Sequence, residues 1–408
     1  MTNTDLNTRI QQLITHAYAH APAIQRMMDA AGLQPSDIQT ADDLAKLPVT
    51  SKDSLVALHK ADPPFGGLLA MNPDDLPRIY ISPGPIFDPN PPNAATGNVS
   101  ASMGALQYLN IGRGDRVLNT FAYHLTPAGM MLDESVIQVG GTVIPAGPGN
   151  SDLQILMMQT LNISTFAGQP SYLMALLDKC EQMGLTKDQI SIKKAAFSAE
   201  PYLPAQQQRF EGEYGMKTTS IYGTADLGSV GFTMQGLQGF VISPTLYLQV
   251  CDPQTGQPLP YGEIGEVVVT SFNQHYALIR FGTGDLGALA ADPDPLTQGR
   301  QQLLGLYGRS GDAVKVRGMF LHPSQLRAGL GLFPQIKQAQ VVITRPQNND
   351  FVTLLLELNP GADSTGLGDN IKALAQGAVR LRIDDVTIVE PGVIDPTQRM
   401  VRDDRVWE

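Results

Sequence analysis

Residues 80–97 read YISPGPIFDPNPPNAATG and have the place of a phosphate-binding loop without its chemistry. A loop that grips a triphosphate needs glycines for close approach, free backbone N–H donors, hydroxyls and often a cation. Here Pro83 and Pro85 remove two N–H donors, Ile86 and Phe87 offer no polar atom, and Asp88 carries a negative charge. The segment therefore raises the question of whether a phosphate grip has been lost or was never present.

Length, composition and charge limit the fold class and the partners of the chain. A chain of 408 residues predicts at least two domains, one large and one small. Apolar residues make up 42% and charged residues 16%, which is typical of a globular α/β protein. The net charge of −11 argues against nucleic acid or an anionic membrane as a partner, because no basic surface is dense enough to replace counterions.

The two cysteines, Cys180 and Cys251, lie far apart and support neither a disulfide framework nor a zinc ribbon. His275 and His322 have no carboxylate or cysteine at ligand spacing, so a metal site built on them is not expected. The N-terminus has no basic-then-apolar signal, and no apolar run approaches the ~18 residues of a membrane span. We expect a soluble protein of the cytoplasm.

Helices and strands, which must position any site, alternate in the first half of the chain. Residues 5–32 have the apolar spacing of amphipathic helices. Short apolar strands then alternate with helices, which predicts a largely parallel sheet covered on both faces. The expected helices are 101–109, 128–139, 152–160, 171–179 and 204–213, and the expected strands are 116–120, 141–145, 164–167 and 194–198.

From about Leu246 the pattern becomes strand, Gly/Pro turn and strand, which indicates an antiparallel β section. The tail predicts a compact α+β domain, with helices at 324–330 and 367–375 and strands at 340–344, 352–358 and 385–389. We therefore expect a large domain over 1–307, a small domain over 308–408, and a hinge near 308–312.

Six motifs occur in an order that resembles the adenylate-forming (ANL) superfamily, and the last, with its PSQ ending, resembles the phenylacetate–coenzyme A ligase branch. They are LPVTSKDSL (47–55), FSAEPYLP (197–204), IYGTADLG (221–228), DPQTGQPLPYGEIGEVVVT (252–270), LIRFGTGDLGAL (278–289) and LYGRSGDAVKVRGMFLHPSQL (306–326). The resemblance implies a small aromatic or short acyl substrate, ATP or AMP with Mg²⁺, coenzyme A or an acyl thioester, and a homodimer. It also implies two steps: ATP and a carboxylate give an acyl-adenylate, then coenzyme A gives the thioester.

The resemblance carries roles onto five matching residues around the adenosine. Tyr222 matches the tyrosine that stacks on adenine, and Asp285 with Arg309 matches the pair that binds the ribose hydroxyls. Ser198 and Glu200 lie in the segment beside the adenine, where the family usually has Gly-Ala-Glu-Pro. The alternative is that Asp285 and Arg309 form an ordinary interdomain ion pair without a role in binding. Such a pair contributes about 1 kcal/mol or less to stability if it is exposed.

Two further matches concern the metal and the thiol. Asp226 takes the position of a glutamate that binds magnesium in the family, and it is one methylene shorter. Gly318, in KVRG, lies near where the family's pantetheine tunnel runs. Alternatively, Tyr222 and Asp226 have only a structural role, as a capped strand end.

The sequence departs from the family pattern in the segments that activate ATP in the family. Where Arg78–Pro89 stands, the family has Arg-Ile-His-Ala-Ser-Ser-Gly-Thr-Thr-Gly-Lys-Pro, so that Asp88 replaces a lysine. A unit charge pair at about 4 Å is worth about 4 kcal/mol at an effective dielectric of about 20, so triphosphate binding should be badly weakened if Asp88 faces the phosphates. At the far end, Arg399 stands at the catalytic lysine of the family, and its planar fork is not equivalent to a compact ammonium.

The segment FAYHLTPAG, 121–129, matches an acyl-pocket region of the family. Tyr123 and His124 could line a pocket for an aromatic acid, and His124 could act on a thioester. The alternative is that His124 is a packed, hydrogen-bonded residue, which a lone histidine beside an aromatic ring usually is.

Three functions stay open from the sequence. The first is an acyl–coenzyme A ligase that still uses ATP, and the second is ATP-independent acyl transfer between thioesters of coenzyme A and an acyl carrier protein. The third is a non-catalytic, ligand-binding homologue. Because the losses fall on the phosphate side while the adenosine motifs persist, we expect adenylation to be impaired or lost.

Overall fold

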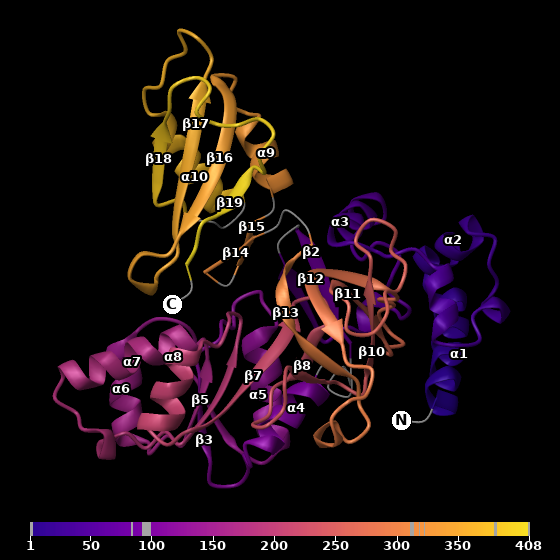
Figure 1. The fold of residues 1–408 in the computed structure, drawn as a ribbon, viewed down its shortest axis with the longest axis horizontal. Coiled ribbons are helices and arrows are strands. Elements are labelled where there is room, and N and C mark those ends of the chain that lie inside the picture. Colours follow the sequence, from indigo (N-terminus) through magenta and orange to yellow (C-terminus); the bar gives the residue numbers. More distant parts are fainter. Residues whose placement is uncertain are drawn as a thin grey trace. The chain divides into compact units, whose positions relative to one another are not determined.

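The computed structural model describes residues 3–82, 85–91, 99–310, 314–317, 319–321, 323–378 and 382–406. The chain divides into two compact units, Met1–Ser310 and Gly311–Glu408 (Figure 1). The division falls inside the expected hinge, three residues beyond the expected boundary between 307 and 308. Among the described residues, no helix has the length and apolar character needed to cross a membrane.

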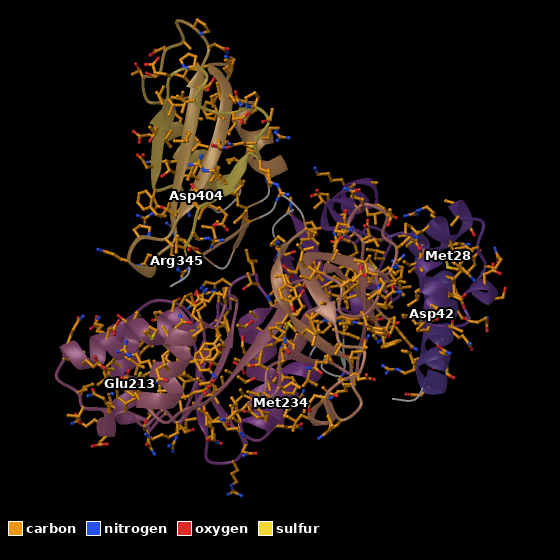
Figure 2. All side chains as sticks on the ribbon, viewed as in Figure 1. Met28, Asp42, Glu213, Met234, Arg345 and Asp404 are labelled. Carbon is orange, nitrogen blue, oxygen red and sulfur yellow. The ribbon has the colours of Figure 1, made fainter. Side chains whose placement is uncertain are left out.

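The helices of the first unit begin with a pair at the N-terminus, where Ile10, Ile14 and Met28 are fully buried; Figure 2 labels Met28. This pair confirms the amphipathic helices expected over 5–32. The expected helix over 204–213 is a short α-helix, α8, followed by a π-helical segment, Gln208–Glu213. The α-helices of this unit are α1 (Asn3–His20), α2 (Pro22–Ala30), α3 (Lys52–Ala61), α4 (Val99–Tyr108), α5 (Ala128–Gln138), α6 (Ser151–Thr160), α7 (Pro170–Gln182) and α8 (Pro204–Gln207).

An eleven-stranded sheet is the frame of the first unit, in the order β10-β11-β12-β13-β9-β8-β7-β6-β5-β3-β4. The half from β4 to β7 is parallel, as the sequence predicts. The antiparallel half begins with β8, earlier than the expected start near Leu246, and the two halves are one continuous sheet. Its strands are β3 (Arg116–Asn119), β4 (Thr142–Pro145), β5 (Thr165–Gly168), β6 (Lys194–Ser198), β7 (Lys217–Thr224), β8 (Gly228–Phe232), β9 (Phe240–Ile242), β10 (Leu246–Cys251), β11 (Gly265–Ser271), β12 (Phe281–Leu289) and β13 (Gln302–Arg309).

The described part of the segment 80–97 belongs to a β-hairpin. The hairpin is antiparallel and consists of β1 (Arg78–Ser82) and β2 (Ile86–Asn90), with Tyr80 paired to Asp88. Tyr80, Ser82, Ile86 and Asp88 are all buried, so one face of the hairpin turns toward the body of the unit. Residues 83–84 and 92–97 of the segment lie outside the described residues.

The second unit contains a four-stranded sheet in the order β18-β17-β16-β19, which confirms the expected α+β class. The parallel pairing of its edge strand β19 with β16 has no counterpart in the sequence prediction. Arg345, labelled in Figure 2, and Arg405 both pair with Asp350 beyond the ends of these two strands, at 2.9 and 3.2 Å. Its elements are β14 (Val314–Val316), β15 (Met319–Leu321), α9 (Pro323–Leu330), β16 (Ile336–Thr344), β17 (Phe351–Leu358), α10 (Leu367–Ala378), β18 (Asp385–Ile388) and β19 (Val401–Asp403).

Candidate functional site

Three of the predicted residues form one hydrogen-bonded group, which we name the Asp285 cluster: Tyr222, Asp285 and Arg309. Asp285 on β12 and Arg309 on β13 are register partners, and Arg309 Nη1 lies 2.6 Å from Asp285 Oδ1. The Tyr222 hydroxyl, from β7, donates to Asp285 Oδ2 at 2.8 Å. Burial, and then the charge of Asp285, raises the pKa of Tyr222 well above its usual value. Each oxygen of Asp285 therefore has a partner, and Tyr222 is a neutral donor.

The SAEP segment follows β6 and combines backbone strain with local hydrogen bonds. Ser198 Oγ donates to the carbonyl oxygen of Ile221 at 2.7 Å, and Glu200 Oε1 accepts from the backbone N–H of Ser171 at 2.6 Å in the first turn of α7. Ala199 between them has φ of +77°, in the left-handed region that favours glycine. The Glu200 carboxylate thus compensates the N-terminal dipole of α7.

A second charged group, the Lys52 cluster, contains Lys52, Asp88 and Asp226. Lys52 Nζ donates to both oxygens of Asp226, each at 2.7 Å, and the Asp226 side chain is only 3% exposed. Lys52 is the first residue of α3, which is capped by Ser51 Oγ accepting from the N–H of Ser54 at 3.1 Å. The helix start therefore fixes the ammonium beside Asp226.

Asp88 of the hairpin is the third member, and it is 5% exposed. Neither of its carboxylate oxygens has a hydrogen-bond partner among the described residues. Burial, and then the negative charge of Asp226, raises the pKa of Asp88 to about 7, although Lys52 and the nearby Ser82 hydroxyl oppose the shift. Asp88, which was expected to weaken triphosphate binding if it faced the phosphates, is thus a buried carboxylate in this structure.

Asp226 was expected to hold magnesium only if magnesium-ATP is used, and its surroundings do not fit a divalent cation. Both carboxylate oxygens are taken by an ammonium group, which a cation would have to displace. Over the described parts of the chain, no cluster of three or more His, Cys, Asp or Glu side chains is arranged to hold a metal ion. We therefore assign no catalytic step to a metal ion at Asp226.

The candidate acyl-pocket residues lie between β3 and α5. The Tyr123 hydroxyl donates to Asp133 Oδ2 at 3.0 Å and accepts from Asn119 Nδ2 at 2.7 Å. Burial, and then the charge of Asp133, raises the pKa of Tyr123. His124 is exposed, which differs from the packed alternative. The N–H of Ile81 donates to the carbonyl of Leu125 at 2.8 Å and ties the hairpin to this loop.

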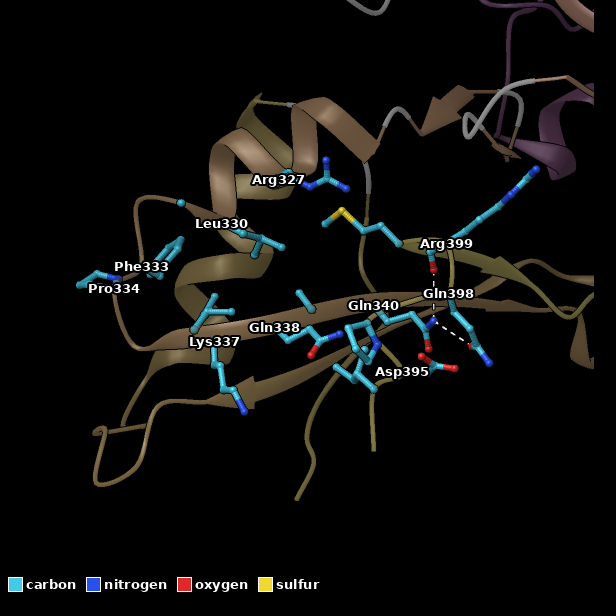
Figure 3. A pocket seen from close by; sticks show the side chains of 16 residues that line it. Arg327, Leu330, Phe333, Pro334, Lys337, Gln338, Gln340, Asp395, Gln398 and Arg399 are labelled. Carbon is cyan, nitrogen blue, oxygen red and sulfur yellow. Dashed lines mark hydrogen bonds between the residues drawn. The ribbon is translucent and has the colours of Figure 1, made fainter. Parts of the chain in front are cut away.

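The second unit has its own cavity of about 410 Å³, lined by α9, β16 and the segment before β19 (Figure 3). Buried Gln340 donates through Nε2 to the carbonyl oxygen of Arg399 at 3.1 Å. In Figure 3 the exposed Arg399 side chain extends away from Gln340, while its carbonyl turns toward it. Gly318 lies outside the described residues; its neighbour Arg317 has φ of +50° and pairs with Asp384.

Comparison with known proteins shows what the chain as a whole is similar to. Residues 94–274 match the family model described as AMP-binding enzyme. The phenylacetate-coenzyme A ligase of Aromatoleum evansii is 28% identical over 378 residues, which cover 90% of this chain and 84% of the relative. That of Thermus thermophilus is 27% identical over 361 residues, covering 86% and 80%. A crystal structure of 2-hydroxyisobutyryl-CoA ligase with 2-HIB-AMP and CoA superposes with a TM-score of 0.90 at 25% identity, covering 99% of this chain and 90% of that one.

The chain contains an AMP-binding enzyme match and is similar over most of its length to phenylacetate–coenzyme A ligases of the adenylate-forming superfamily. It has an acyl-CoA ligase fold, and the residues expected around an adenosine in this superfamily are partly assembled. Tyr222, Asp285 and Arg309 are in direct contact, whereas Ser198 and Glu200 have their side chains engaged in local bonds.

Sequence reasoning missed two residues of this ligase-like fold. Lys52 lies inside the first family motif, and no role was assigned to it, although a cation at a helix start is an unfavourable place that calls for a partner. Arg280 is 1% exposed and has φ of +50°; it donates to Gln249 Oε1 at 3.1 Å and to the carbonyls of Leu47 and Gly256. A single arginine in the apolar run LIRF was the available signal, and its contacts are structural.

Proposed function

We propose that this chain binds an adenylate group at the Asp285 cluster and acts on small acyl or aryl carboxylates, or on their coenzyme A thioesters, with ATP-dependent adenylation impaired or lost. The adenylate part is supported by the assembled contacts of Tyr222, Asp285 and Arg309. It is also supported by the relatives, which are named as phenylacetate-coenzyme A ligases, and by the solved ligase that holds an acyl-adenylate and CoA.

The observation that carries the loss of adenylation is the buried, unpartnered carboxylate of Asp88. It stands on the hairpin that takes the place of the family's phosphate loop, and it lies close enough to Asp226 for the two charges to repel. Charges in a poorly solvated place interact strongly, by about 4 kcal/mol at about 4 Å and an effective dielectric of about 20. A triphosphate brought to this hairpin would find no cation where the family supplies a lysine, and the ionised form of Asp88 would repel it.

Exchange of pyrophosphate into ATP, dependent on an added acid, tests this function. A panel of aryl and short acyl acids should give no acid-dependent exchange. Calorimetric titrations in parallel should show that AMP and an acyl–coenzyme A bind while magnesium-ATP binds at least about tenfold more weakly than AMP. Asp285→Ala is the matched control, because it should abolish AMP binding without touching the hairpin. Acid-dependent exchange by the wild type would contradict the proposal and identify a complete ligase.

The same samples separate the remaining functions. Transfer of an acyl group from coenzyme A to a carrier protein without ATP would identify the thioester transferase, and binding of AMP and acyl thioester without turnover would identify a non-catalytic homologue. His124, exposed beside the hairpin-bound loop, is the proposed side chain for thioester chemistry. His124→Ala should then lower the rate of transfer while leaving AMP binding unchanged. A homodimer and a cytoplasmic location remain part of the proposal, and sedimentation of the purified chain tests the first.

A further inference from the structure

We propose that Lys52 is a built-in counter-ion at a latent divalent cation site formed by Asp226 and Asp88, and that the chain binds its adenylate ligand without magnesium. The first half concerns only Lys52, Asp88 and Asp226. The second half rests on the proposed function, since it needs an adenylate ligand.

The ammonium of Lys52 is placed by the fold. Lys52, Leu55 and His59 lie at i, i+3 and i+7 on α3, and Leu55 and His59 are buried, so this is the face of the helix that turns inward. From that face Lys52 reaches both oxygens of Asp226 at 2.7 Å, and its side chain is 20% exposed. Two short contacts to one carboxylate occupy the positions that an oxygen-liganded cation would use.

The hairpin supplies further oxygen ligands that nothing in the described chain uses. Asp88 is nine-tenths buried with both oxygens unpartnered, and it interacts electrostatically with Asp226, Lys52 and Tyr276. The hydroxyl of Ser82, close to Asp88, is also without a partner among the described residues. Two carboxylates and a nearby hydroxyl are oxygen ligands of the kind that Mg²⁺ and Mn²⁺ prefer.

The charge balance explains why the lysine matters. Lys52 supplies one positive charge against the two carboxylates, so the cluster is neutral only if Asp88 holds a proton. With Lys52 in place, a divalent cation would have to break two charge-assisted hydrogen bonds before it could bind. Without Lys52, the two carboxylates would repel each other with no counter-ion and would bind a divalent cation to relieve that repulsion.

Titration with Mn²⁺ alone tests the latent site without any nucleotide. Wild type should show no Mn²⁺-dependent rise in its melting temperature, whereas Lys52→Met should gain one together with stoichiometric binding by calorimetry. The double variant Lys52→Met with Asp88→Asn should bind Mn²⁺ at least about tenfold more weakly than Lys52→Met. Lys60→Met, an exposed lysine on the same helix, is the matched control and should behave as wild type.

Two results would overturn the latent site: a folded Lys52→Met that gains no Mn²⁺ binding, or a wild type whose Mn²⁺ binding is lost in Asp226→Asn. The second needs no Lys52 variant, so it decides the matter even if Lys52→Met does not fold.

The nucleotide half is tested on the wild type by titrating AMP in millimolar MgCl₂ and again in EDTA, with equal affinity expected. A loss of about tenfold or more in EDTA would overturn it. Failure of AMP to bind in both buffers would refute the adenylate ligand, and with it this half and the proposed function, while the Mn²⁺ titration would still decide the latent site.

Discussion

The Asp285 cluster and the Lys52 cluster belong to the same unit and differ in how their carboxylates are satisfied. Asp285 has a separate partner for each oxygen, a tyrosine hydroxyl and a guanidinium. In the Lys52 cluster one ammonium serves Asp226 and leaves Asp88 without a hydrogen bond among the described residues. The first arrangement is self-sufficient, and the second is held together by a single cation. Substitutions in the two clusters should therefore differ in their effects on stability.

Removal of Lys52 should have the largest effect. In Lys52→Met, Asp226 would remain 97% buried as a side chain without its counter-ion, and loss of one partner of a buried ion pair costs about 3–5 kcal/mol. Urea titration should show the free energy of unfolding falling by that amount. Asp226→Asn in the same background should recover part of the loss. An unchanged midpoint in Lys52→Met would mean that the ion pair does not stabilise the fold.

Asp88 should make stability depend on pH. Its pKa is about 7 in the folded chain against 3.8 when solvated, so the folded state keeps a proton that the unfolded state releases between these values. The free energy of unfolding should therefore fall as pH rises from about 4 to 7, by up to about 4 kcal/mol, and then stay level. The charged groups that shift the pKa of Asp88 are Asp226 and Lys52, and the charge of Asp88 in turn helps to raise the pKa of Tyr276.

The matched variant is Asp88→Asn, measured by urea titration at pH 5 and pH 8. It should be more stable than wild type at the higher pH and close to it at the lower one, since the protonated carboxyl and the amide are both neutral. The same difference at both pH values would show that Asp88 is not the group that titrates.

Asp285→Ala should cost about 2–3 kcal/mol of stability and abolish AMP binding. The substitution leaves the buried Tyr222 hydroxyl unpartnered and removes the counter-charge of Arg309, whose side chain is 24% exposed. The loss should be smaller than for Lys52→Met, because Arg309 can turn its charge to water. Chemical denaturation and AMP calorimetry measure the two effects, and retained AMP affinity would contradict a role for this cluster in binding.

The strands and helices can be predicted from the sequence better than the Asp285 and Lys52 clusters can. Strands such as β5 and β6 are short apolar runs buried on both faces, so composition and periodicity are enough to find them. The Asp285 cluster follows from motifs that carry their own spacing. The hairpin was missed because Pro83, Pro85 and Pro89 argue against paired strands, whereas β1 and β2 form a two-stranded edge ribbon in which Pro89 is accommodated. The Lys52–Asp226 pair joins residues 174 positions apart, which no local pattern reveals.

Two buried tyrosines, Tyr222 within the Asp285 cluster and Tyr276 close to the Lys52 cluster, give the smallest expected difference. Tyr222 donates to a charged carboxylate at 2.8 Å, while the Tyr276 hydroxyl lies 3.2 Å from the ring nitrogen Nε2 of His59, whose pKa is lowered by burial. Hydrogen bonds to charged groups contribute about 1.5–3 kcal/mol and those between neutral groups about 1 kcal/mol. Tyr222→Phe should therefore destabilise the chain by about 1 kcal/mol more than Tyr276→Phe, as measured by urea titration at pH 8. Because both substitutions remove one buried hydroxyl and keep the ring, equal losses would show that the charge on Asp285 adds nothing and that the two clusters do not differ in the way proposed.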